Sequence, residues 1–104
     1  MRIDVITERD ELVIRRMVLE PGEAMFWHTD ACRRFSVVVR GDELTIEYQH
    51  SGDRQSVSVV PGLADWDSPQ PLAHRAVNTG AHTFEEVVTF YRDFPDQEPQ
   101  PRAE

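Results

Sequence analysis

Apolar residues recur along the chain mostly in short segments with a period of two, the spacing typical of β-strands. Clear examples are Leu-Thr-Ile-Glu-Tyr at 44–48 and Gln-Ser-Val-Ser-Val at 55–59. Turn signals such as Pro-Gly separate the segments, and no apolar period of 3.6 residues is sustained over three turns. The pattern therefore predicts an all-β domain of seven or eight strands, with little or no helix. The expected strands are Val13–Leu19, Ala24–Asp30, Phe35–Arg40, Leu44–His50, Gln55–Val60, Leu72–Asn78 and Phe84–Arg92.

The end of the chain differs in composition from the rest. Of the seven prolines, three fall in residues 94–104, and this segment has almost nothing apolar after Phe94. Such a segment gains too little burial to offset the entropy of ordering it, so we expect it to be disordered or extended over a neighbouring surface. With 104 residues in total, the sequence predicts a single domain over residues 1–93 and a proline-rich tail over 94–104.

Charge and composition exclude several classes of function. Nineteen acidic residues against eleven basic ones give a net charge of -8, which argues against a nucleic-acid partner. All the basic residues are arginines, so neither a lysine Schiff base nor a P-loop is available. The single cysteine, Cys32, cannot form an intramolecular disulfide. The longest apolar run spans four residues and the amino terminus carries acids, so we expect a cytoplasmic protein with no membrane partner.

A small set of residues with metal-ligating chemistry stands out. His28 and Asp30 are two apart in an expected strand, which puts their side chains on one face together with Phe26. Each of two Pro-Gly pairs, at 21–22 and 61–62, precedes a histidine, so paired hairpins would bring His74 to the same interior. Two imidazoles and a carboxylate suit iron, manganese, zinc or nickel. The pattern therefore predicts a candidate metal site at His28, Asp30 and His74.

These positions also carry a resemblance to a known family. Gly22, His28, Asp30, Arg34 and Gly41 follow the spacing of the first cupin motif, which has a second histidine where Asp30 stands and a glutamate where Arg34 stands.

The second cupin motif is matched less completely. His74 and Asn78 fit it, whereas Pro71 replaces its second glycine and one extra residue separates Gly62 from the proline that follows it. The chain thus resembles a small single-domain cupin with a degenerate metal-binding motif. The resemblance implies a jelly-roll β-barrel, often a dimer.

The departures from the motif leave two interpretations open. Arg34 cannot ligate a metal and repels one, because guanidinium has only donors and carries a positive charge. Either Arg34 turns away and a divalent metal binds, as in a metal-dependent enzyme such as a dioxygenase or isomerase, or an Asp30–Arg34 ion pair fills the site. In the second case the protein is a metal-free ligand-binding or regulatory module. Arg34 is then a candidate to grip the carboxylate of a small anionic molecule. Whether the protein is an enzyme stays open.

Several other residues have candidate roles around the pocket. Trp66 is expected in a loop at the pocket mouth, where it and Phe26 are candidate ligand-binding residues. Trp27 faces away from His28 and, with the apolar faces of Val13–Leu19, predicts a homodimer interface. In the last strand, either Glu85 or Glu86 must face inward, as a possible base or fourth ligand.

Overall fold

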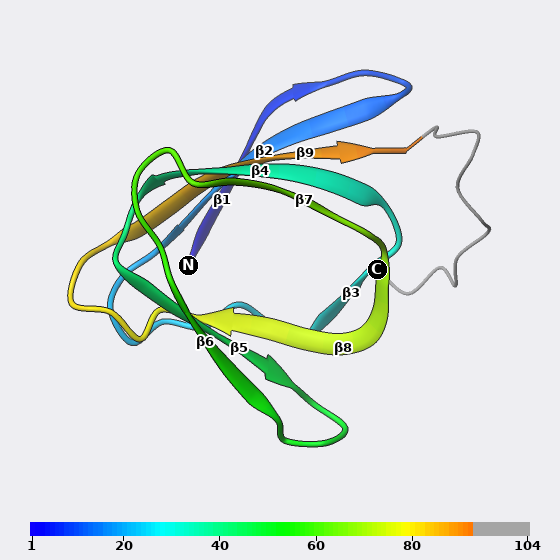
Figure 1. The fold of residues 1–104 in the computed structure, drawn as a ribbon. Helices are drawn as coiled ribbons and strands as arrows, with labels where there is room; N and C mark the ends of the chain where they lie inside the picture. The colour runs from blue at the N-terminus through cyan, green and yellow to red at the C-terminus, as the bar shows by residue number, and fades with distance from the viewer. Residues whose placement is uncertain (93–104) are drawn as a thin grey trace.

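The computed structural model describes residues 1–92, which form two antiparallel sheets that face each other (Figure 1). The five-stranded sheet has the order β1-β2-β9-β4-β7, and the four-stranded sheet has the order β3-β8-β5-β6. No helix occurs within these residues, so the all-β prediction is confirmed. The strands are β1 (Arg2–Glu8), β2 (Leu12–Leu19), β3 (His28–Asp30), β4 (Arg33–Arg40), β5 (Glu43–Tyr48), β6 (Arg54–Ser58), β7 (Ala64–Asp67), β8 (Gln70–Val77) and β9 (Phe84–Tyr91).

Nine strands are present in this part of the chain, where seven or eight were predicted. Each predicted segment contains a strand, although Ala24–Asp30 is regular only over β3, with an isolated bridge from Ala24 to Val77. The two unpredicted strands are β1 and β7. β1 alternates charged and apolar residues only from Arg2 to Val5 and lies almost wholly exposed, and β7 is a four-residue strand with two aspartates. Both are held by pairing with a neighbouring strand rather than by burying an apolar face of their own.

Two Pro-Gly turns carry the chain from one sheet to the other, between β2 and β3 and between β6 and β7, rather than closing the hairpins that were predicted. In each, an amide N–H donates to the carbonyl three residues earlier, from Glu23 to Glu20 at 2.9 Å and from Leu63 to Val60 at 3.1 Å. The turn glycines have φ of 86° and 89°, values that a side chain disfavours, which is why glycine follows proline there. Beyond these turns, His28 on β3 lies directly opposite His74 on β8.

The hydrophobic core fills one end of the space between the sheets. The register places Leu19 of β2 opposite Phe84 of β9, and both side chains are fully buried. Asn78 is buried beside them, where its side-chain amide donates to the carbonyls of Leu19 and His82. The other end of the interior holds the candidate site. The core cluster consists of Met17, Leu19, Val38, Leu44, Val59, Ala76 and Phe84.

Trp27 lies on the outside of the barrel, as the alternation predicted. Its ring is half-buried, with the guanidinium carbon of Arg75 4.3 Å from the ring centroid. The homodimer that Trp27 suggested stays a prediction. Within residues 1–92 no helix is long and apolar enough to cross a membrane. The predicted tail, residues 94–104, lies outside the described residues.

Candidate functional site

His28, Asp30 and His74 converge in the interior of the barrel. One potential ligand atom from each residue lies within 4.8 Å of the other two, and the two imidazole centroids are 4.6 Å apart. Asp30 and His74 are buried, and His28 is half-buried. Period-two alternation on β3 and the pairing of β3 with β8 produce this cluster. The predicted convergence is therefore confirmed as geometry.

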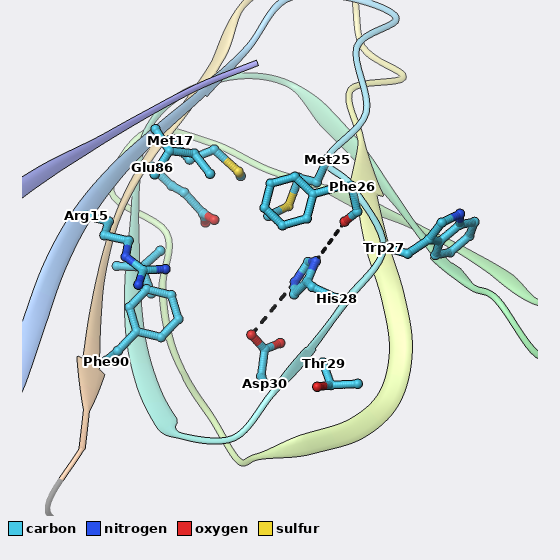
Figure 2. A pocket seen from close by; sticks show the side chains of 12 residues that line it. Arg15, Met17, Met25, Phe26, Trp27, His28, Thr29, Asp30, Glu86 and Phe90 are labelled. Carbon is cyan, nitrogen blue, oxygen red and sulfur yellow. Dashed lines mark hydrogen bonds and ion pairs between the residues drawn. The ribbon is translucent and has the colours of Figure 1, made fainter. Parts of the chain in front are cut away.

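Backbone carbonyls fix the orientation of both imidazole rings. Nδ1 of His28 lies 3.0 Å from the Phe26 carbonyl oxygen, and Nδ1 of His74 lies 2.7 Å from that of Leu72. A carbonyl oxygen only accepts, so each Nδ1 carries the hydrogen. Each Nε2 then points toward Asp30, at 2.8 Å for His74 and 3.8 Å for His28 (Figure 2 shows the His28 contacts). Neutral imidazole in this tautomer has its lone pair on the nitrogen that faces the cluster.

Asp30 and His74 stabilise each other's charged forms. Burial alone would raise the pKa of Asp30, but the hydrogen bond from His74 and the charge of Arg34 outweigh it and hold this pKa below its ordinary value. The same hydrogen bond raises the pKa of His74, against the lowering effect of burial. With no metal at the cluster, the geometry favours an Asp30 carboxylate paired with a His74 imidazolium.

Arg34 stays inside and joins the cluster. Its Nη1 lies 3.2 Å from Oδ2 of Asp30 and donates to the carbonyl oxygen of Ser68 at 3.4 Å. Its side chain is only 18% exposed. The Asp30–Arg34 ion pair that the sequence left as one alternative is thus present, and part of the guanidinium is already occupied by these two oxygens.

The three donors nevertheless fit a divalent transition metal. Two imidazole nitrogens and one carboxylate are a common donor set for such ions. With bonds of about 2.1 Å, two ligand atoms on one ion lie at most about 4.2 Å apart, so a small side-chain adjustment suffices. The backbone carbonyls behind His28 and His74 provide the outer hydrogen bonds that ligating histidines normally make. The one misfit is Arg34, whose charge occupies the place of a further ligand.

A cavity of about 360 Å³ opens beside His28 and Asp30. Its walls are mostly apolar, with Met17 on one side and Met25 on the other (Figure 2), and Val88 also lines it. Arg15 and Glu86 project from the wall formed by β2 and β9, opposite His28 and Asp30 (Figure 2). The cavity is therefore lined by apolar surface with polar groups at both sides, which is the usual make-up of a small-molecule site.

Glu86 is the glutamate of the last strand that faces inward. Burial raises the pKa of its carboxyl to about 7, and the charge of Arg34 only partly opposes this effect. Its neighbour Glu85 faces outward and accepts a hydrogen bond from Arg40 at 2.9 Å. Glu86 lines the cavity but does not join the three-residue cluster, so the structure does not place it as a fourth ligand.

Sequence reasoning missed Arg15. Its guanidinium carbon lies 4.9 Å from the centroid of the Phe90 ring, and both side chains line the cavity. The signal was present in the pair Arg15–Arg16, because two adjacent residues on a strand face opposite sides and one of them had to point inward. The same argument was applied only to the adjacent glutamates of the last strand.

The fold has close counterparts among solved structures. A cupin domain from Bordetella pertussis superposes with a TM-score of 0.78 at 15% identity, covering 88% of this chain and 93% of that one. An RmlC-like cupin with a double-stranded β-helix fold from Methanocaldococcus jannaschii gives 0.69 at 16% identity, covering 86% and 78%. A cupin 2 conserved barrel domain protein from Salinispora arenicola gives 0.65 at 15% identity, covering 88% and 75%. No protein-family model and no curated protein matches the sequence.

The chain has the cupin fold. The resemblance seen in the two motifs is thus confirmed as a fold, and these identities carry no information about activity. On the cupin barrel, the motif positions of His28 and His74 lie side by side on adjacent strands. The position where the motif has glutamate holds Arg34, against the carboxylate of Asp30.

The two aromatic candidates occupy different places on the cupin barrel. Phe26 lines the cavity, with its ring edge-on to His28 at a centroid distance of 6.1 Å, and 59% of it is exposed. Trp66 belongs to β7 rather than to a loop, and its ring packs against Phe35 and Tyr91. Trp66 is not among the residues that line this cavity. The expected loop position at its mouth is therefore corrected, because β7 pairs with β4 and turns the ring onto another surface.

Proposed function

We propose that this protein binds a divalent transition metal through His28, Asp30 and His74, and a small organic molecule in the adjoining cavity. The observation that carries the proposal is the convergence of three donors, with Nδ1 of both histidines held by backbone carbonyls so that each Nε2 faces the cluster. When bound, such an ion would supply Lewis acidity at its open coordination positions. Iron, manganese, zinc and nickel all suit this donor set.

In this proposal the protein's own residues bind and orient. His28, Asp30 and His74 hold the ion, and the apolar walls of the cavity exclude water from the molecule beside it. Metal binding must displace the proton on Nε2 of His74, since this nitrogen now donates to Asp30. Binding is therefore expected to release protons and to weaken at low pH.

A metal-free binding module is the second candidate, favoured by the contact between Arg34 and Asp30. At an effective dielectric constant of about 20, two unit charges 4 Å apart interact by about 4 kcal/mol, so a divalent ion beside Arg34 meets a repulsion of roughly twice that. In the metal-free protein, Asp30 is already neutralised by His74 and Arg34. Under this alternative, Asp30 stays paired with His74 and Arg34, and the cavity beside this pairing binds the ligand.

Metal analysis separates the two candidates. Protein purified without a nickel column is analysed for bound metal, then treated with EDTA and titrated with Mn²⁺, Fe²⁺, Zn²⁺ and Ni²⁺. The proposal expects one ion per chain with at least one of these metals, and loss of that ion in His28→Ala. His50→Ala, which changes an exposed histidine, is the matched control and should bind as the unaltered protein does. Absence of stoichiometric binding of any of the four metals favours the metal-free module.

A further inference from the structure

We propose that the cavity binds a small organic anion, a compact carboxylic acid with an apolar body, through the guanidinium of Arg15 and the carboxyl of Glu86. The inference deepens the ligand-binding half of the proposed function and rests on it. It does not require that a metal binds. The residues that carry it lie on β2 and β9, across the cavity from His28 and Asp30 (Figure 2).

Arg15 presents its donors to the cavity without a polar partner. In the part of the chain that the structure describes, no hydrogen bond or ion pair satisfies its guanidinium, and its guanidinium carbon lies 4.9 Å from the centroid of the Phe90 ring. A guanidinium has five N–H donors in a planar fork that matches the two oxygens of a carboxylate. The ring of Phe90 supports the guanidinium, which limits its freedom before a ligand arrives.

The outward-facing neighbours on the same strands behave differently. Arg16 lies 3.7 Å from a carboxylate oxygen of Asp4, and Glu85 accepts a hydrogen bond from Arg40 at 2.9 Å. In each adjacent pair, Arg15–Arg16 and Glu85–Glu86, the outer member is thus in an ion pair and the inner member is not, although Nε of Arg16 is itself buried without a hydrogen-bond partner. Partly buried polar groups without partners lose free energy unless something satisfies them. A ligand in the cavity supplies that partner.

Glu86 complements Arg15 as a hydrogen-bond donor. Its carboxyl faces the same cavity, and no hydrogen bond or ion pair joins it to another residue within 1–92. Burial raises the pKa of this group to about 7, so its protonated form is available near neutral pH to donate to a carboxylate. The charged and titratable groups that act on it or share its cavity are Arg34 on β4, Asp67 on β7, Asp30 and His28 on β3, and Arg15 on β2.

The balance of charge selects an anion. Arg15, Arg34 and the His74 imidazolium carry three positive charges in this part of the interior, against the carboxylates of Asp30 and Asp67 and a Glu86 that is partly ionised near neutral pH, while the chain as a whole carries -8. The remaining walls are apolar and the volume is about 360 Å³, so the body of the ligand is compact and apolar. Arg34 was the residue expected to grip a carboxylate, but Asp30 already holds it, and Arg15 takes that role.

Calorimetric titration of the EDTA-treated full-length chain tests the inference. The probes are benzoate, phenylacetate and isovalerate, with phenylacetamide as the uncharged counterpart of phenylacetate. We expect at least one carboxylate to bind, and phenylacetate to bind about tenfold or more tightly than its amide. Arg15→Gln should weaken carboxylate binding by about 10- to 100-fold, whereas Arg16→Gln, on the outer face of the same strand, should change it less than about twofold.

Variation of pH tests the part played by Glu86. Affinity of the unaltered protein for the carboxylate should fall as the pH rises through about 7, because ionised Glu86 repels the ligand. Glu86→Gln should remove most of this fall, and Glu85→Gln should keep it. The inference is overturned if none of the three carboxylates binds, if phenylacetamide binds as well as phenylacetate, or if Arg15→Gln retains full affinity. The acid–amide comparison needs no variant, and metal titration of the same sample shows separately whether the metal site fails.

Discussion

The two sides of the barrel interior satisfy their polar groups in opposite ways. On one side, Asp30 of β3 is held by His74 of β8 at 2.8 Å and by Arg34, which reaches it from β4, at 3.2 Å, so the carboxylate is paired without a ligand. On β2 and β9, Arg15 and Glu86 face the same cavity with no polar partner in the described chain. The first side can be recognised from a motif. The side with Arg15 and Glu86 can be recognised only when the surroundings of each side chain are known. It is the basis for the proposal that the cavity binds an organic anion.

Removing the anion at the centre of the complete cluster should have the largest effect. Asp30→Ala leaves the His74 and Arg34 side chains in the interior without their shared acceptor. Breaking a buried ion pair by removing one partner commonly costs about 3–5 kcal/mol, and we expect a loss in this range in the free energy of unfolding. Urea denaturation near neutral pH measures it. Asp53→Ala, at an exposed turn, is the control, and a loss in Asp30→Ala no larger than the control's would contradict the account.

Replacement of Glu86, on the unpaired side, should raise the free energy of unfolding, whereas replacement of Asp30 lowers it. Because the folded-state pKa of Glu86 is raised from 4.5 to about 7, its contribution to stability is fully present below the lower value and is lost as the pH rises through the upper one. At about pH 8, Glu86→Gln should therefore stabilise the fold by up to about 3 kcal/mol.

Thermal or urea unfolding of three proteins across this pH range provides the measurement. Stability of Glu86→Gln relative to the unaltered protein should grow from acid to alkaline pH, whereas Glu85→Gln should show no such trend. Differences between variants cancel the titration of Asp30 and His74, which acts in all three proteins. A difference that does not change with pH would show that Glu86 is not held in its protonated form.

Arg34 links the two sides, and its replacement sharpens the comparison. Arg34→Gln removes the charge that repels an ion, so metal affinity at His28, Asp30 and His74 should rise by about tenfold or more. Arg40→Gln changes a mostly exposed arginine of the same strand and should leave affinity unaltered. Arg34→Glu should bind Mn²⁺ or Fe²⁺ more tightly still, yet be less stable without metal, because two carboxylates then meet. Unchanged metal affinity in both Arg34 variants would favour the metal-free module.

The sequence was enough to predict those residues of the site whose placement depends only on their position along a strand. His28 and Asp30 share a face by alternation, as predicted, and His74 lies in the same interior, although the pairing of β3 with β8 brings it there and not a Pro-Gly hairpin. Whether Arg34 points inward depends on a contact with Asp30 that no spacing specifies. Arg15 was missed for a related reason. Alternation ensures that one of two adjacent arginines faces inward, but not that it meets an aromatic ring and an open cavity.

Limits of the same kind apply to the fold. The strands with buried alternate residues were found, whereas β1 and β7 lack that signal because they are short or exposed and are held by pairing with β2 and β4. Trp66 illustrates the consequence. With β7 unrecognised, its ring was expected at a loop on the pocket mouth, but strand pairing places it against Phe35.

A crystal structure of the protein soaked with Zn²⁺ or Mn²⁺, with anomalous scattering recorded at the metal's absorption edge, tests the central claim most directly. The account predicts one strong peak within bonding distance, about 2.0–2.3 Å, of Nε2 of His28, Nε2 of His74 and a carboxylate oxygen of Asp30. The Arg34 guanidinium should then have moved away from Asp30. Anomalous density found only at surface residues such as His50 and His82, with Arg34 still paired to Asp30, would contradict it.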